Sequence, residues 1–124
     1  MIESKELVLT RQDEKLRLHR RLQNQAVDLA AKNRWEEAVE VNEQLKALGE
    51  SSDTYNRLGK AFFELGRLAE ARDAYRDALR LTPNNLIARK NLDRIEELLS
   101  RSSSHAVPVK AGRIGINYSP FDNV

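Results

Sequence analysis

The sequence contains no cysteine and few aromatic residues, which make up 6% of its 124 residues. Without cysteine the chain can form neither disulfides nor thiolate nucleophiles. No run of about 18 apolar residues is present, so we expect no membrane span. The N-terminal segment MIESKELVLTRQDEK lacks the charged, apolar and small-residue order of a secretion signal. We therefore expect a soluble cytoplasmic protein.

Histidine is also scarce, since His19 and His105 are the only two. They lie far apart in the sequence, and neither has neighbours at the spacing of metal ligands. Adjacent carboxylates such as Glu36 and Glu37 do not face each other on a helix, so they favour a solvated surface over an acid–base pair. The sequence predicts no enzyme, no cofactor and no metal site.

Charge is abundant but nearly balanced, with 32% charged residues and a net charge of +2. Composition alone therefore gives no reason to expect a nucleic-acid-binding protein. The hydrophobic fraction is 40%, and alanine and leucine dominate it, as is typical of helices with small-residue interfaces. The length suits one small domain.

Apolar residues recur every three to four positions along most of the chain, which predicts helices. The first stripe follows Thr10 and Asp13, a pair that resembles a helix N-cap signature, and comprises Leu18, Leu22, Ala26 and Leu29. Further helices are predicted over 34–47, 53–65, 68–81 and 86–100. The predicted helices end at residues that tolerate or impose a break, namely Asn33, Gly49, Gly66 and Pro83.

Gly59 lies inside the predicted helix 53–65. A glycine there costs roughly 1 kcal/mol relative to alanine, so a compensating gain is expected. We predict that Gly59, together with Ala71, marks the closest approach of the helices 53–65 and 68–81.

Two segments repeat each other 33 residues apart, RWEEA from Arg34 and RLAEA from Arg67. A helix pair that recurs at this period is typical of a solenoid. Residues 52–85 resemble the tetratricopeptide repeat at eight landmarks: Tyr55, Leu58, Gly59, Phe62, Ala71, Tyr75, Ala78 and Pro83. Residues 19–51 resemble it more weakly, since Gln25-Ala26 replaces Leu-Gly and Asn42 replaces the aromatic residue.

The chain thus resembles a small, bacterial-type tetratricopeptide repeat protein. The resemblance implies an all-α solenoid of two helix pairs with a C-terminal capping helix. We predict an N-terminal extension over 1–18 and a repeat domain over 19–101. Within that domain we expect a degenerate repeat, a clear repeat and a capping helix over 19–51, 52–85 and 86–101. Residues 102–124, rich in serine, glycine and proline, are predicted to form an extended tail.

In tetratricopeptide repeat proteins the first helix of each pair lines a concave groove that holds a partner. Here the resemblance implies a basic, amide-rich groove suited to acidic segments. These side chains are equally compatible with a solvated helix face. Its expected partner-binding residues are Arg20, Gln23, Asn24, Asn56, Arg57, Lys60, Lys90 and Arg94, and Phe63 is a further candidate on the same face.

Two segments outside the repeat offer further contacts. The basic stretch KLRLHRR, from Lys15 to Arg21, suits RNA or an acidic protein surface, or its long side chains cover apolar neighbours while staying wet. The tail alternates apolar residues that suit folding back into the groove or adding a strand to a partner. Its candidate contact residues are Ile116, Tyr118 and Phe121.

The sequence therefore predicts a non-catalytic protein–protein interaction module, an adaptor or an assembly subunit of a larger complex. The alternative is a nucleic-acid- or ribosome-associated factor that docks through the basic first helix and the tail residues Lys110 and Arg113. A third hypothesis is self-association, in which solenoid ends stack on each other.

Overall fold

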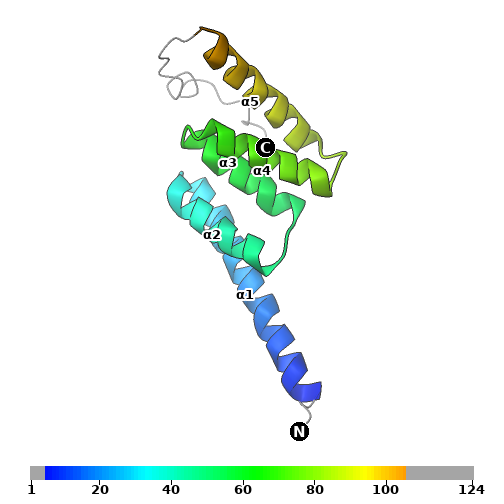
Figure 1. Cartoon of the computed structure of the whole chain (residues 1–124). Coiled ribbons are helices and arrows are strands. Elements are labelled where there is room, and N and C mark those ends of the chain that lie inside the picture. The colour runs from blue at the N-terminus through cyan, green and yellow to red at the C-terminus, as the bar shows by residue number, and fades with distance from the viewer. Residues whose placement is uncertain (1–4, 106–124) are drawn as a thin grey trace.

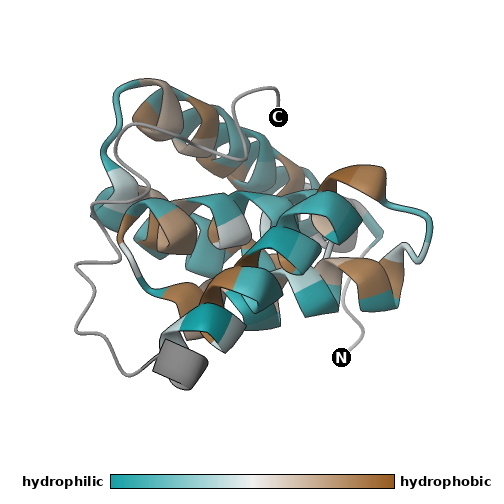
Figure 2. Ribbon diagram, turned by 90° about the horizontal axis from the view of Figure 1, so that it is seen from above, coloured by the Kyte–Doolittle hydropathy of each residue, from teal (hydrophilic) through white to brown (hydrophobic). Residues whose placement is uncertain are grey.

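A computed structural model of the protein describes residues 5–105. Within that range the chain forms helices joined by short loops, each packed against its neighbours in sequence (Figure 1). Figure 2 shows that every helix carries both hydrophilic and hydrophobic residues, as amphipathic helices of a layered core require. The helices are α1 (Lys5–Ala31), α2 (Trp35–Leu48), α3 (Ser52–Glu64), α4 (Leu68–Leu81) and α5 (Leu86–His105).

The turns inside the two helix pairs form where the sequence predicts them. Asn33 has φ 58° between α1 and α2, and Gly66 has φ 77° between α3 and α4. Both conformations are left-handed, which asparagine and glycine tolerate better than other residues. The start of α3 is capped by Ser51, whose hydroxyl accepts a hydrogen bond from the Thr54 amide at 3.1 Å.

Two predicted helix ends are wrong. The helix α1 begins at Lys5, so Thr10 lies inside the helix and does not cap it. The helix α5 continues to His105, so Ser102 to Ser104 are helical and do not begin an extended tail. In both segments no glycine or proline interrupts the chain, and serine and threonine alone disfavour a helix only weakly. The predicted extended tail that follows lies outside the described residues.

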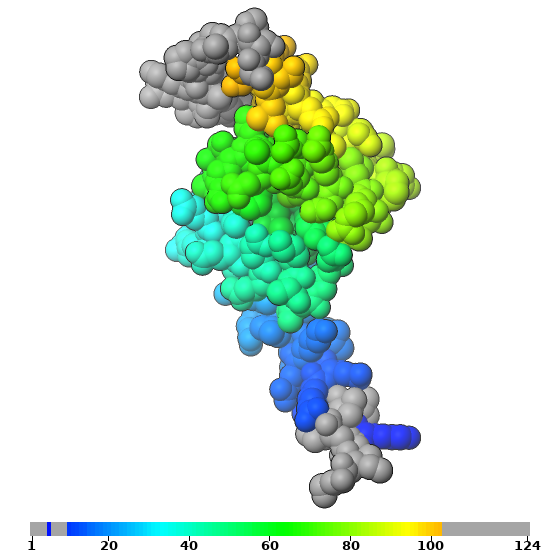
Figure 3. Space-filling view, in the orientation of Figure 1, coloured from blue at the N-terminus to red at the C-terminus, as the bar shows by residue number. Residues whose placement is uncertain are grey.

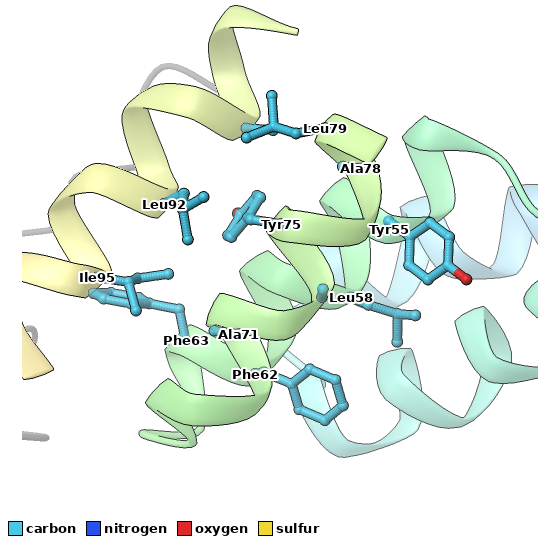
Figure 4. Packing of buried hydrophobic residues seen from close by; sticks show 12 residues of the cluster. Tyr55, Leu58, Phe62, Phe63, Ala71, Tyr75, Ala78, Leu79, Leu92 and Ile95 are labelled. Atoms are coloured by element: carbon cyan, nitrogen blue, oxygen red, sulfur yellow. The ribbon is translucent and has the colours of Figure 1, made fainter. Parts of the chain in front are cut away.

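The core consists of two clusters of buried side chains. The smaller one joins α1 to α2, and the larger one runs through α3, α4 and α5. Figure 4 shows the larger cluster, with Tyr75 between the side chains of α3 and those of α5. The smaller cluster contains Leu22, Ala26, Val41 and Leu45. The larger contains Tyr55, Leu58, Phe62, Phe63, Ala71, Ala74, Tyr75, Ala78, Leu79, Ala88, Leu92 and Ile95.

Gly59 lies against the ring of Tyr75, as the predicted close approach of α3 and α4 requires. A Cβ atom at Gly59 would lie 2.4 Å from Cε2 of Tyr75, well inside van der Waals contact. The corresponding positions of the first helix pair are Ala26 and Asn42, both buried. In the first pair, Asn42 replaces the larger Tyr75, and Ala26 adds the methyl group that Gly59 lacks.

Phe63 is part of the larger core cluster and has an exposed fraction of 8%. The prediction that it stands on the partner-binding face is therefore wrong. Figure 4 shows its ring beside Ile95 of α5. Phe63 is buried because α5 packs against the second helix pair. The apolar stripe of α3 alone does not predict this contact.

The N-terminal half of α1 extends beyond the rest of the solenoid (Figures 1 and 3). The helix α1 has 27 residues and α2 has 14, which correspond to about 40 Å and about 21 Å. Because α2 runs back along the C-terminal half of α1, the N-terminal half has no described helix beside it.

Polar side chains connect the ends of the helices of the second pair. Asn85 accepts a hydrogen bond from the Ala88 amide at 3.1 Å and donates to the Ser52 hydroxyl at 2.8 Å. The Ser52 hydroxyl in turn donates to the carbonyl of Ala78 at 3.3 Å. The start of α5 is thus tied to the start of α3 and the end of α4.

Candidate binding surface

Three polar residues of α3 lie beside the stripe of side chains that the helix buries in the core. Tyr55, Leu58 and Phe62 turn one side of α3 into the core. Asn56, Arg57 and Lys60 are half-buried beside it. Residues three and four positions apart are neighbours on a helix surface, so Asn56 and Arg57 both adjoin Lys60. The helix therefore presents an amide and two cations together.

Asn56 and Arg57 each have one buried side-chain atom without a hydrogen-bond partner among the described residues. These atoms are Oδ1 of Asn56 and Nη1 of Arg57. Arg57 also forms no ion pair within the described part of the chain. A polar atom that has left water without a new hydrogen bond is destabilising, by about 1–3 kcal/mol in mutational data. Within the described residues, Oδ1 of Asn56 and Nη1 of Arg57 are thus shielded from solvent without a hydrogen bond.

Lys60 is more strongly engaged within the protein. Its ammonium lies 3.5 Å from the Glu64 carboxylate and 5.9 Å from the centroid of the Trp35 ring. Both contacts stabilise the cation, and the Trp35 contact links α3 to the first helix pair. Part of the charge of Lys60 is therefore satisfied internally.

The two predicted residues of α5, Lys90 and Arg94, also differ in how far they are engaged in contacts within the protein. Lys90 is exposed and has no ion pair among residues 5–105. Arg94 is half-buried and pairs with Glu97 at 2.5 Å, one helical turn away. Of the two, Lys90 is the more available to a partner.

The predicted residues of α1 lie on its surface. Arg20 and Asn24 are exposed, and Gln23 is half-buried. An open hollow of about 480 Å³ runs along one side of the helix. It is lined by Arg17, Arg20, Arg21, Asn24, Gln25 and Asp28. The predicted tail residues Ile116, Tyr118 and Phe121 lie outside the described residues.

Sequence reasoning gave no role to Leu16 and Val27, which the structure leaves exposed on α1. Their exposed fractions are 62% and 56%. A signal was available, since both fall off the stripe formed by Leu18, Leu22 and Leu29. Large apolar residues away from the buried stripe of a helix are the ones that remain in water.

The shifted pKa values belong to residues that hold the fold together. Hydrogen bonds from Tyr55 and Arg80 lower the pKa of the Glu50 carboxyl. The same Glu50 contact raises the pKa of Tyr55 to about 12. Burial raises the pKa of Tyr75. None of these groups is among the predicted partner-binding residues.

The described residues offer no recognisable centre for metal binding. Between Lys5 and His105 no group of three or more histidine, cysteine, aspartate or glutamate side chains is arranged to hold a metal ion. No helix in the same part of the chain is long and apolar enough to cross a membrane. The surface groups named above are suited to hydrogen bonds and ion pairs with a partner.

The stacked helix pairs and the polar surface of α3 together define an α-solenoid repeat protein. The profile of the tetratricopeptide repeat family matches residues 52–85, the segment that carries all eight landmarks. Residues 52–85 therefore form a tetratricopeptide repeat, which is built by α3 and α4. The repeat is an interaction fold and is in general not catalytic.

One curated relative is the small glutamine-rich tetratricopeptide repeat-containing protein 2 of Mycosarcoma maydis. The two sequences are 44% identical over 50 residues, which are 40% of this chain and 14% of the relative. The chain thus matches only a small part of that protein. No solved structure is similar enough to the chain to count as a match.

Proposed function

We propose that the protein is a non-catalytic adaptor or assembly subunit that binds an acidic segment of a protein partner. The contact surface comprises the polar side of α3 and Lys90 of α5, with Arg20, Gln23 and Asn24 of α1 extending it. In tetratricopeptide repeat proteins these first helices of each pair line the binding groove. The tail residues Ile116, Tyr118 and Phe121 are proposed to add a second contact.

One observation carries this proposal: Arg57 is only partly buried beside Asn56 and forms no ion pair within the described residues. An acidic segment brings carboxylate and carbonyl acceptors for Arg57 and backbone amides for Asn56. Lys90 adds a cation that forms no ion pair within residues 5–105. A guanidinium is well suited to this role, because its planar fork can bind a carboxylate through two hydrogen bonds.

The experiment is affinity capture from a lysate of the native organism, with quantification of the captured proteins. We compare the full chain with Arg57→Glu/Lys90→Glu, which reverses two charges on the proposed surface. The matched control Lys46→Glu/Arg72→Glu makes the same change of charge on the second helices of the pairs. We expect the first variant to lose a captured protein that the control retains. Equal capture by all three chains would contradict the proposal.

The tail is tested in the same experiment by a chain that ends at His105, which leaves α5 whole. We expect reduced capture of the partner. Unchanged capture of every protein by the shortened chain would remove the tail from the proposal while leaving the helical surface in it.

A second candidate function is docking on nucleic acid or a ribosome. It rests on the arginine side chains that line the hollow on α1, Arg17, Arg20 and Arg21. Binding to phosphates weakens steeply with salt because counterions are released, with a slope of about −0.9 per phosphate contact on duplex DNA. A salt series on the captured complex separates the two functions. A steep loss of binding together with sensitivity to nuclease favours nucleic acid.

A further inference from the structure

The exposed surface of α1 has two chemical characters side by side. Leu16 and Val27 lie on nearly the same side of the helix, because 11 residues are close to three turns. Arg20 lies between them and slightly to one side, and Arg17 and Arg21 follow further around. Leu16 and Val27, about 16 Å apart along the helix, thus mark an apolar strip that Arg20 interrupts and that adjoins a cationic strip of Arg17, Arg20 and Arg21.

Neither strip is satisfied by the described parts of the molecule. Leu16 and Val27 are more than half exposed. Arg20 and Arg21 form no ion pair within residues 5–105, whereas Arg17 pairs with Asp13 at 2.6 Å. The two unpaired guanidinium groups line the open hollow on the helix. The cationic strip therefore keeps charge available for a partner.

Part of this surface lies on the half of α1 that projects from the solenoid (Figure 3). About 13 residues without a neighbouring helix are marginal as an isolated helix in water. A second helix laid along the projecting half would bury Leu16 and stabilise that half of α1. Amphipathic helices dock on one another through such strips.

We propose that this surface of α1 binds an amphipathic helix of a partner that carries an acidic strip beside an apolar one. The proposal rests on the proposed function and names the chemistry of the partner segment that α1 contacts. A second copy of α1 is disfavoured as the occupant, because it would bring its own arginines against Arg20 and Arg21. A nucleic acid would match the arginines but would leave Leu16 and Val27 in water.

The test measures fluorescence anisotropy of a labelled synthetic helical peptide of about five turns against the full chain. Its leucines follow the i, i+3/i+4 spacing, and glutamates flank them. One control peptide has lysine for each glutamate, and the other has serine for each leucine. We expect the acidic, leucine-bearing peptide to bind at least about tenfold more tightly than either control.

Variants of the chain locate the binding. We expect Val27→Ser, Leu16→Ser and Arg20→Glu/Arg21→Glu each to weaken binding of the peptide by about tenfold. Matched controls are Leu86→Ser, which removes a side chain 80% exposed on α5, and Lys46→Glu/Arg72→Glu. Both controls should bind like the unchanged chain. Circular dichroism checks that each variant is folded.

Several results would overturn the proposal. These are no binding of the acidic peptide, equal binding of the lysine peptide, or equal binding by the Leu16 and Val27 variants. Sedimentation of the chain as a dimer that Leu16→Ser dissociates would assign the surface to a second copy. Binding of polyuridylate that Arg20→Glu/Arg21→Glu abolishes, without peptide binding, would assign it to nucleic acid.

Failure here is distinguishable from failure of the proposed function. If Arg57→Glu/Lys90→Glu abolishes capture of the partner while Val27→Ser leaves it unchanged, the adaptor function stands. The apolar and cationic strips of α1 are then not its binding surface.

Discussion

Gly59 lies inside α3 because the ring of Tyr75 occupies the place of its side chain. Tyr75 is completely buried, and its ring lies between side chains of α3 and α5 (Figure 4). The close packing of α3 on α4 offsets the roughly 1 kcal/mol that glycine costs in a helix. The size of the side chain at position 59 is therefore limited by the ring at position 75.

We predict that Gly59→Ala destabilises the protein. The added Cβ would lie 2.4 Å from Tyr75, and overpacking of a core typically costs about 1–3 kcal/mol. The gain in helix propensity of about 1 kcal/mol offsets only part of that. Urea unfolding followed by circular dichroism measures the difference. Gly49→Ala is the control, because nothing lies within 4 Å of its added Cβ, and it should change stability by less than about 0.5 kcal/mol.

At the residue scale the sequence predicts packing better than binding. Gly59 is correctly interpreted because repeat landmarks report directly on helix contacts. The environments of Arg57 and Lys60 could not be predicted. The contact of Lys60 with Trp35 joins two helix pairs, and the unpartnered atom of Arg57 depends on what neighbouring helices cover.

At the scale of elements, the short polar links between helix ends hold the second repeat and α5 together. Asn85 caps α5 and also reaches Ser52 at the start of α3. One side chain thus performs a local and a tertiary role. The loss of either role can be measured separately, because aspartate keeps the acceptor oxygen and lacks the amide donor.

We predict that Asn85→Ala lowers the free energy of unfolding by about 0.5–2 kcal/mol, the usual range for loss of an N-cap. Asn85→Asp should lose less, since its carboxylate still accepts the Ala88 amide. Chemical denaturation of the two variants checks the order. Equal stability of Asn85→Ala and the unchanged chain would show that the cap contributes nothing.

A second link gives the protein a defined dependence on pH. Glu50, in the loop between α2 and α3, accepts hydrogen bonds from Tyr55 and from Arg80, and both lower its pKa. A carboxyl with a lowered pKa in the folded state stabilises the protein above its ordinary value of 4.5. That contribution is lost as the pH falls through the lowered pKa.

We therefore predict that the urea midpoint of the protein falls more steeply from about pH 5 to about pH 3 than that of Glu50→Gln. On the alkaline side the sign reverses for Tyr55. Its raised pKa adds stability that is present below its ordinary value of 10 and is lost towards about 12. Identical acid profiles for Glu50→Gln and the unchanged chain would rule out a role for this link.

The helix ends show where sequence patterns suffice. Asn33, Gly66 and Pro83 are recognised because backbone conformation restricts which residues can occupy such positions. The start of α1 and the end of α5 were misplaced because no such residue marks them. Helix length there depends on continuing hydrogen bonds, and serine or threonine residues do not by themselves end a helix.

At the scale of the whole molecule, two helix pairs and one further helix form a short solenoid. Fewer than three full repeats usually need additional stabilisation. The helix α5 supplies part of it by covering Tyr75 and Phe63. The projecting half of α1 has no described neighbour, which is consistent with a partner completing that end.

The fold class and the repeat were predictable because periodicity and landmark spacing are properties of the sequence itself. The environment of the proposed binding residues was only partly predictable. Arg20, Lys90 and Asn24 are exposed as expected, but exposure alone does not identify a partner. Recognition depends on which groups remain unsatisfied after folding, and that is a property of the packed molecule.

The most direct test of the proposed adaptor function is a charge-reversal rescue with the captured partner in purified form. We predict that Arg57→Glu/Lys90→Glu raises the Kd for the partner at least about tenfold, while Lys46→Glu/Arg72→Glu leaves it unchanged. Replacing acidic residues of the partner segment by lysine should restore affinity for the first variant. Equal affinity of all these chains for the partner would contradict the account.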